Sequence, residues 1–280
     1  GFSDTTSLDG KAVFALAAAD HNGNYANNTE ALQMQYMYQM NLNSSFTGDD
    51  NLYVRLKTGN AQSWTKDKDH GTYLSSAKGN SDVLKVDKIW YSFPVGENNT
   101  VWIGPKIENY YMHGATPSIY APITKQFKLG GNGAAYGAST DSGIGWAYKA
   151  DNGFSLSSNV VSKQNKSTKG FLTNEAKTNW STQVAYTTDT YHLSLIGALK
   201  YNGWTDSYYT TSLGKARPDG NSTNYGLRGY WRPDTESQAV PEISAGYDIS
   251  YVDGQTADTD AYFVGLTWKD TFQADDKIGI

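Results

Sequence analysis

The chain has 280 residues, a net charge of -5, no cysteine and an aromatic fraction of 14%. The lack of cysteine excludes disulfide frameworks and thiol catalysis, and the absence of a long basic run gives nucleic-acid binding no electrostatic support. No apolar run reaches the roughly twenty residues of a membrane helix, which excludes a helical membrane protein but leaves a membrane barrel open.

The first predicted strand covers 8–18, and a loop rich in Asn and Gly leads to a long strand over 31–46. In that second stretch Leu32, Met34 and Tyr36 alternate with Gln33 and Gln35. A period of two places apolar groups on one face of a strand and amides on the other, whereas a helix would scatter them. The stretch is also longer than a usual strand of about five or six residues, as a tilted strand that crosses a bilayer must be.

The same alternation predicts further strands along the rest of the chain. They cover 52–57, 83–93, 101–107, 144–148, 154–160, 180–186, 191–201, 225–231, 243–251 and 262–268, with a last strand beginning near 277. Short turns are expected at 47–50, 94–99, 151–153 and 188–190, and long loops begin near 20, 61, 108, 162 and 202. Alternating short turns and long loops, with aromatic residues near strand ends, are typical of outer-membrane barrels.

A soluble β-sandwich that binds polysaccharide would also alternate and would also be rich in Tyr and Trp. Its strands would be shorter, and its loops would show no two-sided length pattern. An enzyme is a more distant alternative, because no GxSxG, HExxH or P-loop pattern is present. The residues favour the membrane barrel over both.

Several segments resemble the cyanobacterial outer-membrane porins of the iron-uptake type, which are related to carbohydrate-selective porins. The segments are SLDGKAVFAL (7–16), LNSSFTGDDNLYVRLKTGN (42–60), WYSFPVG (90–96), WIGPKIENYYM (102–112), KQFKLGGNGAAYGA (125–138) and GLTWKD (265–270). The resemblance implies an up-and-down antiparallel barrel of about 16 strands when complete. It also implies a homotrimeric channel in the outer membrane, surrounded by lipid, through which inorganic ions, iron among them, and small hydrophilic solutes diffuse.

Such porins carry an N-terminal peptidoglycan-binding domain and a coiled coil, and their barrels continue to a C-terminal aromatic residue. Neither N-terminal segment is present in this chain, which ends at Ile280. We therefore expect the chain to be one incomplete barrel domain, read as part of a longer precursor, with about 13 strands represented and the closing strands missing.

If the apolar face meets lipid, the alternate residues line a pore. The predicted pore-lining residues are Gln35, Gln39, Arg55, Lys57, Lys88, Arg228, Tyr230 and Arg232. The longest irregular stretch, 108–141, is the candidate constriction loop, with Tyr110, Tyr111, His113, Lys125 and Lys128 as solute-facing groups. The basic members predict a mild preference for anions or neutral polar solutes, although ordinary solvated charges and a loop that only fills space explain the pattern equally well. We expect neither a cofactor nor a metal site, because the four histidines lie far apart in the sequence.

Overall fold

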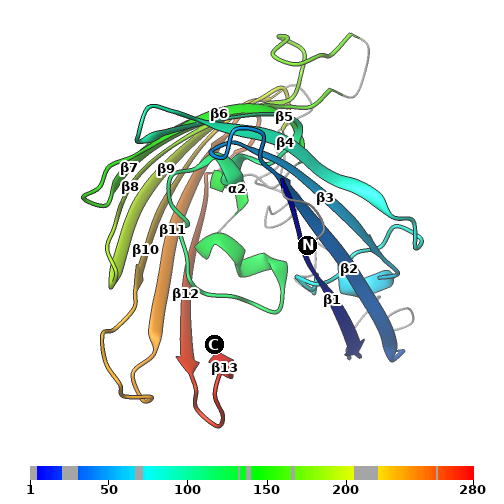
Figure 1. Cartoon of the computed structure of the whole chain (residues 1–280), viewed down its shortest axis with the longest axis vertical. Helices are drawn as coiled ribbons and strands as arrows, with labels where there is room; N and C mark the ends of the chain where they lie inside the picture. The colour runs from blue at the N-terminus through cyan, green and yellow to red at the C-terminus, as the bar shows by residue number, and fades with distance from the viewer. Residues whose placement is uncertain are drawn as a thin grey trace.

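The computed structural model describes residues 5–20, 31–66, 72–131, 133–136, 140–164, 168–204, 220–256 and 258–280. Within these residues one antiparallel sheet of 13 strands runs in the order of the sequence, each strand pairing with the next. The sheet curves around a concave side, on which short helical segments lie (Figure 1). The prediction of an all-β, up-and-down antiparallel fold is confirmed.

The bounds of the elements follow the predicted ranges closely. The strands are β1 (Thr6–Ala17), β2 (Gln33–Ser44), β3 (Asn51–Gly59), β4 (Lys85–Val95), β5 (Asn99–Ile107), β6 (Asp141–Lys149), β7 (Phe154–Ser162), β8 (Thr178–Thr187), β9 (Tyr191–Tyr201), β10 (Ser222–Trp231), β11 (Glu242–Val252), β12 (Thr259–Lys269) and β13 (Lys277–Gly279). The described residues also form four short helical segments, η1 (Ser63–Lys66), η2 (Asn109–Met112), η3 (Lys125–Gly130) and α2 (Gly133–Tyr136).

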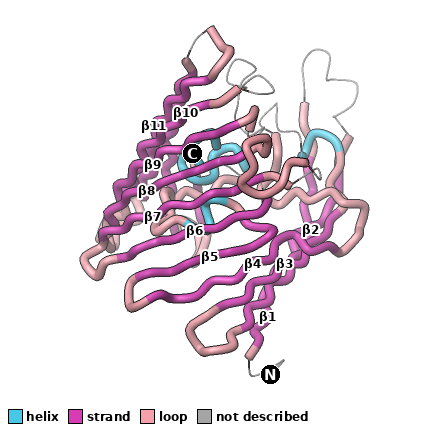
Figure 2. Tube along the Cα trace, turned by 90° about the horizontal axis from the view of Figure 1, so that it is seen from above, coloured by secondary structure: helices cyan, strands magenta, loops and turns pink. Residues whose placement is uncertain are grey.

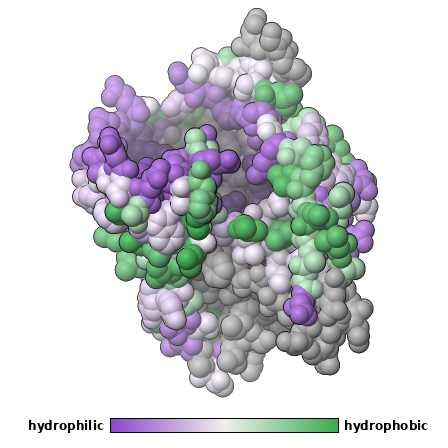
Figure 3. All heavy atoms as spheres, turned by 90° about the horizontal axis from the view of Figure 1, so that it is seen from below, coloured by the Kyte–Doolittle hydropathy of each residue, from purple (hydrophilic) through white to green (hydrophobic). Residues whose placement is uncertain are grey.

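The two faces of the sheet have inverted polarity compared with a water-soluble protein. On β2, Met34 is 77% exposed, while its neighbour Gln35 is 6% exposed. On β8, Trp180 and Val184 are exposed and Gln183 is fully buried. Apolar groups therefore lie on the outside of the curved sheet and polar groups on its concave side, and green apolar patches follow the outer surface in Figure 3.

The alternative of a soluble β-sandwich is wrong. A sandwich packs the apolar faces of two sheets against each other, whereas these strands form one sheet whose apolar face is exposed. An apolar surface this extensive marks contact with lipid or another protein. Among the described residues, none of the helical segments is both long enough and apolar enough to cross a membrane.

One local departure from the predicted strands occurs at the end of β4. The turn expected at 94–99 is shorter, because β4 continues through Pro94, which stands opposite Thr100 on β5. Proline suits extended backbone and is tolerated near the end of a strand. Gly96 has a φ of 67° and provides the left-handed residue of the tight turn.

Replacing Leu195 by Arg tests which medium the outer face meets. Leu195 lies near the middle of β9 and is 53% exposed. In a bilayer the charge should cost about 2–4 kcal/mol at mid-depth, whereas at an exposed site in water the change should stay within about 0.5 kcal/mol. The measurement is the free energy of unfolding from lipid vesicles. Tyr201→Arg, at the end of the same strand, is the matched control and should cost at most about 1 kcal/mol; equal and negligible effects at both positions would contradict a lipid-facing wall.

Candidate functional site

The connection from β5 to β6 folds back onto the concave side of the sheet. It carries η2, η3 and α2, which lie inside the curve of the strands in Figure 2. Asn109 begins its attachment: its Nδ2 donates to Asn159 Oδ1 at 2.6 Å, and Asn179 Nδ2 donates to its Oδ1 at 3.2 Å. All three amides are buried, so β7 and β8 fix the start of this loop through hydrogen bonds between buried polar groups.

His113 is the second point of attachment. Its Nδ1 lies 3.0 Å from Ser157 Oγ, and its Nε2 lies 3.2 Å from Ser181 Oγ. Burial lowers the pKa of His113 to about 3, so the imidazole is neutral at ordinary pH. The histidine predicted to face solute instead lies between the loop and the wall and takes no part in the charge of the interior.

Residues of β8 and β10 hold the middle and the end of the loop. The side chain of Gln183 accepts from the backbone N–H of Ala115 at 3.1 Å and donates to its carbonyl at 3.0 Å. Arg228 donates through Nε to the carbonyl of Leu129 at 2.9 Å and through Nη2 to Asp248 Oδ1 at 2.8 Å. Arg228 is 1% exposed; it is therefore a buried anchor of the loop and does not line the interior cavity.

The loop from β3 to β4 pairs with the same connection. Lys125 N–H donates to the carbonyl of Tyr73 at 2.8 Å, and Ser75 N–H donates to the carbonyl of Ile123 at 2.7 Å. The ammonium of Lys125 lies 4.5 Å from the centre of the Tyr73 ring, within the range of a cation–π contact. The two loops thus form a short antiparallel bridge, and this bridge fixes the position of Lys125.

A cavity of about 360 Å³ lies between β1–β4 and the folded loops. Its walls are more polar than apolar, and seven of the lining residues are basic while two are acidic. The basic residues are Lys11, Arg55, Lys57, Lys78, Lys88, Lys125 and Lys128, and the acidic residues are Asp87 and Glu108. Gln39, Tyr110 and Tyr111 line it as well, so the structure brings most of the predicted pore and constriction residues together.

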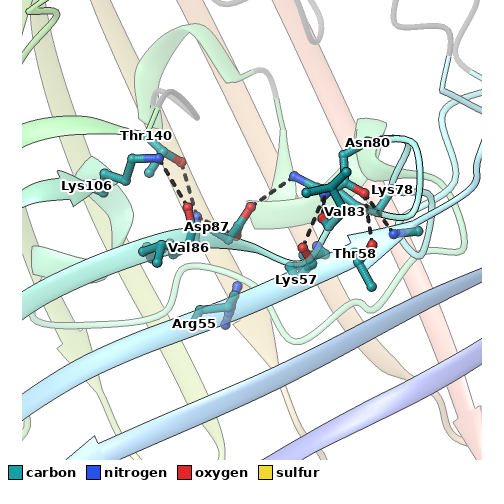
Figure 4. Close-up of polar contacts among 12 residues, drawn as sticks. Arg55, Lys57, Thr58, Lys78, Asn80, Val83, Val86, Asp87, Lys106 and Thr140 are labelled. Carbon is teal, nitrogen blue, oxygen red and sulfur yellow. Dashed lines mark hydrogen bonds and ion pairs between the residues drawn. The ribbon is translucent and has the colours of Figure 1, made fainter.

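A β-bulge brings two adjacent ionisable residues to the same side of β4. Arg55 pairs with Lys88 and Leu56 pairs with Val86, so Asp87 is the extra residue of the bulge. Asp87 accepts from Lys78 Nζ at 3.1 Å (Figure 4). Strict alternation would have placed Asp87 and Lys88 on opposite faces, so the sequence pattern gave no signal for Asp87.

Glu108 is the second carboxylate of the cavity and is also paired. Its Oε1 lies 2.5 Å from Lys88 Nζ and accepts from Thr140 Oγ1 at 2.5 Å. Burial alone would raise the pKa of Glu108, but Lys88 and the hydrogen bonds outweigh it and hold the pKa below its usual value. Both acids of the cavity are therefore ionised and already neutralised by Lys78 and Lys88.

Four other cations of the cavity have no such carboxylate partner among the described residues. Among the described residues, Lys11, Lys57, Lys128 and Arg55 have no carboxylate oxygen within 4.0 Å. Arg55 donates through Nε to the amide oxygen of Asn41 at 3.1 Å. Partial desolvation, followed by the nearby charges of Lys125, Lys11 and Arg55, lowers the pKa of Lys128, with Glu108 opposing. The cavity thus carries an excess of positive charge in a protein whose net charge is negative.

Aromatic side chains pack beside the basic groups of the cavity. The rings of Tyr110 and Tyr111 stack at 4.7 Å, and those of Tyr53 and Trp90 stack at the same distance. Lys88 lies 5.5 Å from the centre of the Tyr111 ring. Burial raises the pKa of Tyr110 well above its usual value, so its hydroxyl stays protonated and adds no negative charge.

Three predicted residues lie elsewhere. Tyr230 stacks on His192 at 4.8 Å, and Arg232 Nε lies 3.3 Å from Glu242 Oε1. Both contacts lie at the end of the sheet where the turn at 188–190 joins β8 to β9. Gln35 is buried and accepts from Thr65 Oγ1 in η1 at 2.8 Å. Lys11 was missed, although its position opposite the apolar face of β1 was a usable signal. No cluster of three or more His, Cys, Asp or Glu side chains able to hold a metal ion occurs in the described part of the chain.

Comparison with known proteins identifies the family. Residues 1–280 match the family described as carbohydrate-selective porin, OprB family. The chain belongs to this porin family. In accordance with that membership and with its fold, the protein is located in the outer membrane.

Solved porin structures share the fold of this porin at low sequence identity. OprB of Pseudomonas putida is 12% identical with a TM-score of 0.58, and the match covers 98% of this chain and 73% of that one. OmpT of Vibrio cholerae is 14% identical with a TM-score of 0.53, and the match covers 95% of this chain and 73% of that one. These likenesses support the fold alone.

A cyanobacterial relative is closer in sequence. An uncharacterized protein of Nostoc sp. (strain PCC 7120) is 30% identical over an alignment 198 residues long, which covers 62% of this porin and 32% of the relative. The match thus spans about a third of the length of that curated relative.

Replacing His113 by Gln should make the free energy of unfolding less dependent on pH in the acidic range. A folded-state pKa near 3 against the ordinary 6.5 means that the unfolded chain binds the proton first, so the free energy of unfolding falls as pH decreases from about 6.5 towards 3. Glutamine keeps hydrogen-bonding capacity without titrating. The measurement is unfolding of both proteins across this pH range, and parallel curves would contradict a neutral, buried His113.

Proposed function

We propose that this porin allows passive diffusion of inorganic ions and small hydrophilic solutes, and that its constriction favours anions. The single observation that carries the proposal is the cavity beside β1–β4, with seven basic and two acidic lining residues. The family and the fold indicate a channel rather than an enzyme.

The physical argument rests on confinement of the excess charge. Fixed cations inside low-dielectric walls raise the local concentration of anions and repel cations, and rings of Lys and Arg favour anions in pores. The carboxylates of Asp87 and Glu108 are occupied by lysines, so they do little to offset Lys11, Lys57 and Lys128. Neutral solutes meet hydroxyl and amide groups on the same walls.

Reversal potentials in a salt gradient across planar bilayers test the preference. The wild type should select anions, and the double variant Lys57→Glu, Lys128→Glu should shift the reversal potential towards cation selectivity, because it changes the local charge by four. Lys106→Glu is the matched control, since Lys106 is exposed and does not line the cavity. Clear cation selectivity of the wild type would overturn the proposal.

Deleting 118–127 should raise single-channel conductance. The deletion removes Lys125 and the bridge between Ile123 and Ser75, and with them a part of the loop that fills the interior. Deleting 235–239, in a connection away from the cavity, is the control and should leave conductance unchanged. Unchanged conductance in the first variant would mean that this segment does not narrow the path.

We further propose that the natural protein is a porin of the cyanobacterial iron-uptake type, with iron as one of the permeating ions. The barrel is completed by further strands, for a total of about 16, and is preceded by a peptidoglycan-binding domain and a coiled coil. The much longer Nostoc relative supports this, as do the outer edges of β1 and β13, which pair with no further strand among the described residues. A homotrimer is supported by the trimer form recorded for Vibrio cholerae OmpT; sedimentation of the full-length protein in detergent and its binding to isolated peptidoglycan test these assignments.

A further inference from the structure

The cations of the cavity lie in two adjacent rows across β1–β4. In one row Lys11 pairs with Gln39, and Gln39 pairs with Lys57. In the next row Asn41 pairs with Arg55, and Arg55 pairs with Lys88. Neighbouring strands lie about 4.8 Å apart, so the wall presents a regular array of positive charge; Figure 4 shows Arg55 and Lys57 side by side on β3.

A second group of cations faces this array from the folded loop. Lys125 is fixed by the backbone bridge to Tyr73 and by the contact with its ring. Lys128 follows three residues later in η3 and lies within electrostatic range of Lys11 and Arg55. Cations from two separate parts of the chain therefore converge on one cavity.

The nearby carboxylates are already engaged. Asp87 binds Lys78, and Glu108 binds Lys88. Asp9 pairs with Asn41 in the second row and accepts from Asn41 Nδ2 at 2.6 Å. Among the described residues no carboxylate oxygen lies within 4.0 Å of Lys11, Lys57, Lys128 or Arg55, so the repulsion among these four cations is only partly offset.

We propose that this cavity is a binding site for a doubly charged tetrahedral oxyanion, of which inorganic phosphate is the simplest example. The ion lies between the wall array, Lys11, Lys57 and Arg55, and the loop lysines Lys125 and Lys128. Its oxygens accept charge-assisted hydrogen bonds from ammonium and guanidinium groups. The inference rests on the proposed function and deepens it by naming the permeating class that the constriction holds longest.

Charge and geometry favour a dianion over chloride or a neutral sugar. A single chloride contacts only one or two cations at a time, whereas an oxyanion with several acceptor oxygens bridges groups on both sides of the cavity. Lysine acts on phosphate as a point charge and arginine as a planar fork, and both types are present. The volume of about 360 Å³ accommodates the ion together with water, or an organic group that bears the phosphate.

The test is the current carried by chloride through the full-length protein in a planar bilayer. Adding inorganic phosphate at constant ionic strength should reduce the chloride current in a saturable way, and nitrate, a singly charged oxyanion, should not. In a separate experiment glycerol 3-phosphate replaces inorganic phosphate. A block of the chloride current as strong as that of inorganic phosphate would show that the site also takes organic phosphates, and a weaker block would show that it prefers the free ion. Anion-selective reversal potentials without any saturable block would overturn the site while leaving the proposed function intact.

Substitutions in the cavity test which residues bind the phosphate. Lys57→Gln with Lys128→Gln should weaken the phosphate block about tenfold or more, because charge-assisted contacts are lost. Lys57→Arg should retain the block, and Lys106→Gln, exposed and outside the cavity, is the matched control. An unchanged block in the double variant would overturn the assignment.

A thermal measurement stands independently of the variants. Phosphate bound to the native state should raise the melting temperature of the wild-type protein by mass action, and the rise should exceed that produced by nitrate at equal ionic strength. Identical shifts with the two anions would show that only general screening acts, and would contradict the site.

Discussion

The polar side chains on the concave side of the wall are the constraint on which the rest of the structure depends. Strands whose apolar groups face outwards must place amides and hydroxyls inside, and such buried groups need partners. The connection between β5 and β6 supplies them, because Asn109 and His113 meet the amides and serines of β7 and β8. The loop is therefore held inside by the same inversion of polarity that suits the wall to a membrane.

The position of the loop determines which charged groups meet in the cavity. Its attachment brings Glu108 to Lys88 and brings Lys125 and Lys128 opposite the basic groups of β1–β3. The bulge at Asp87 provides a second local acid, which neutralises Lys78. The charged groups of the cavity are therefore of two kinds. The ion pairs maintain the shape of the interior, and the remaining cations make its electrostatic potential positive.

The alternation in sequence predicted all thirteen strands and the outward apolar face, because a period of two follows directly from strand geometry. The same rule pointed to Gln39, Arg55 and Lys57. It failed where the backbone breaks the period, as at Asp87, and where tertiary contacts assign a role, as for Arg228 and His113, which anchor the loop. Burial of that kind depends on how the loop folds back, which local patterns do not encode.

The backbone bridge between Tyr73–Ser75 and Ile123–Lys125 joins two connections that are distant in the chain. A change of length in the β3–β4 connection that shifts Tyr73 would also displace the lysine opposite it. We therefore expect insertions and deletions in one segment to be compensated in the other among homologous chains.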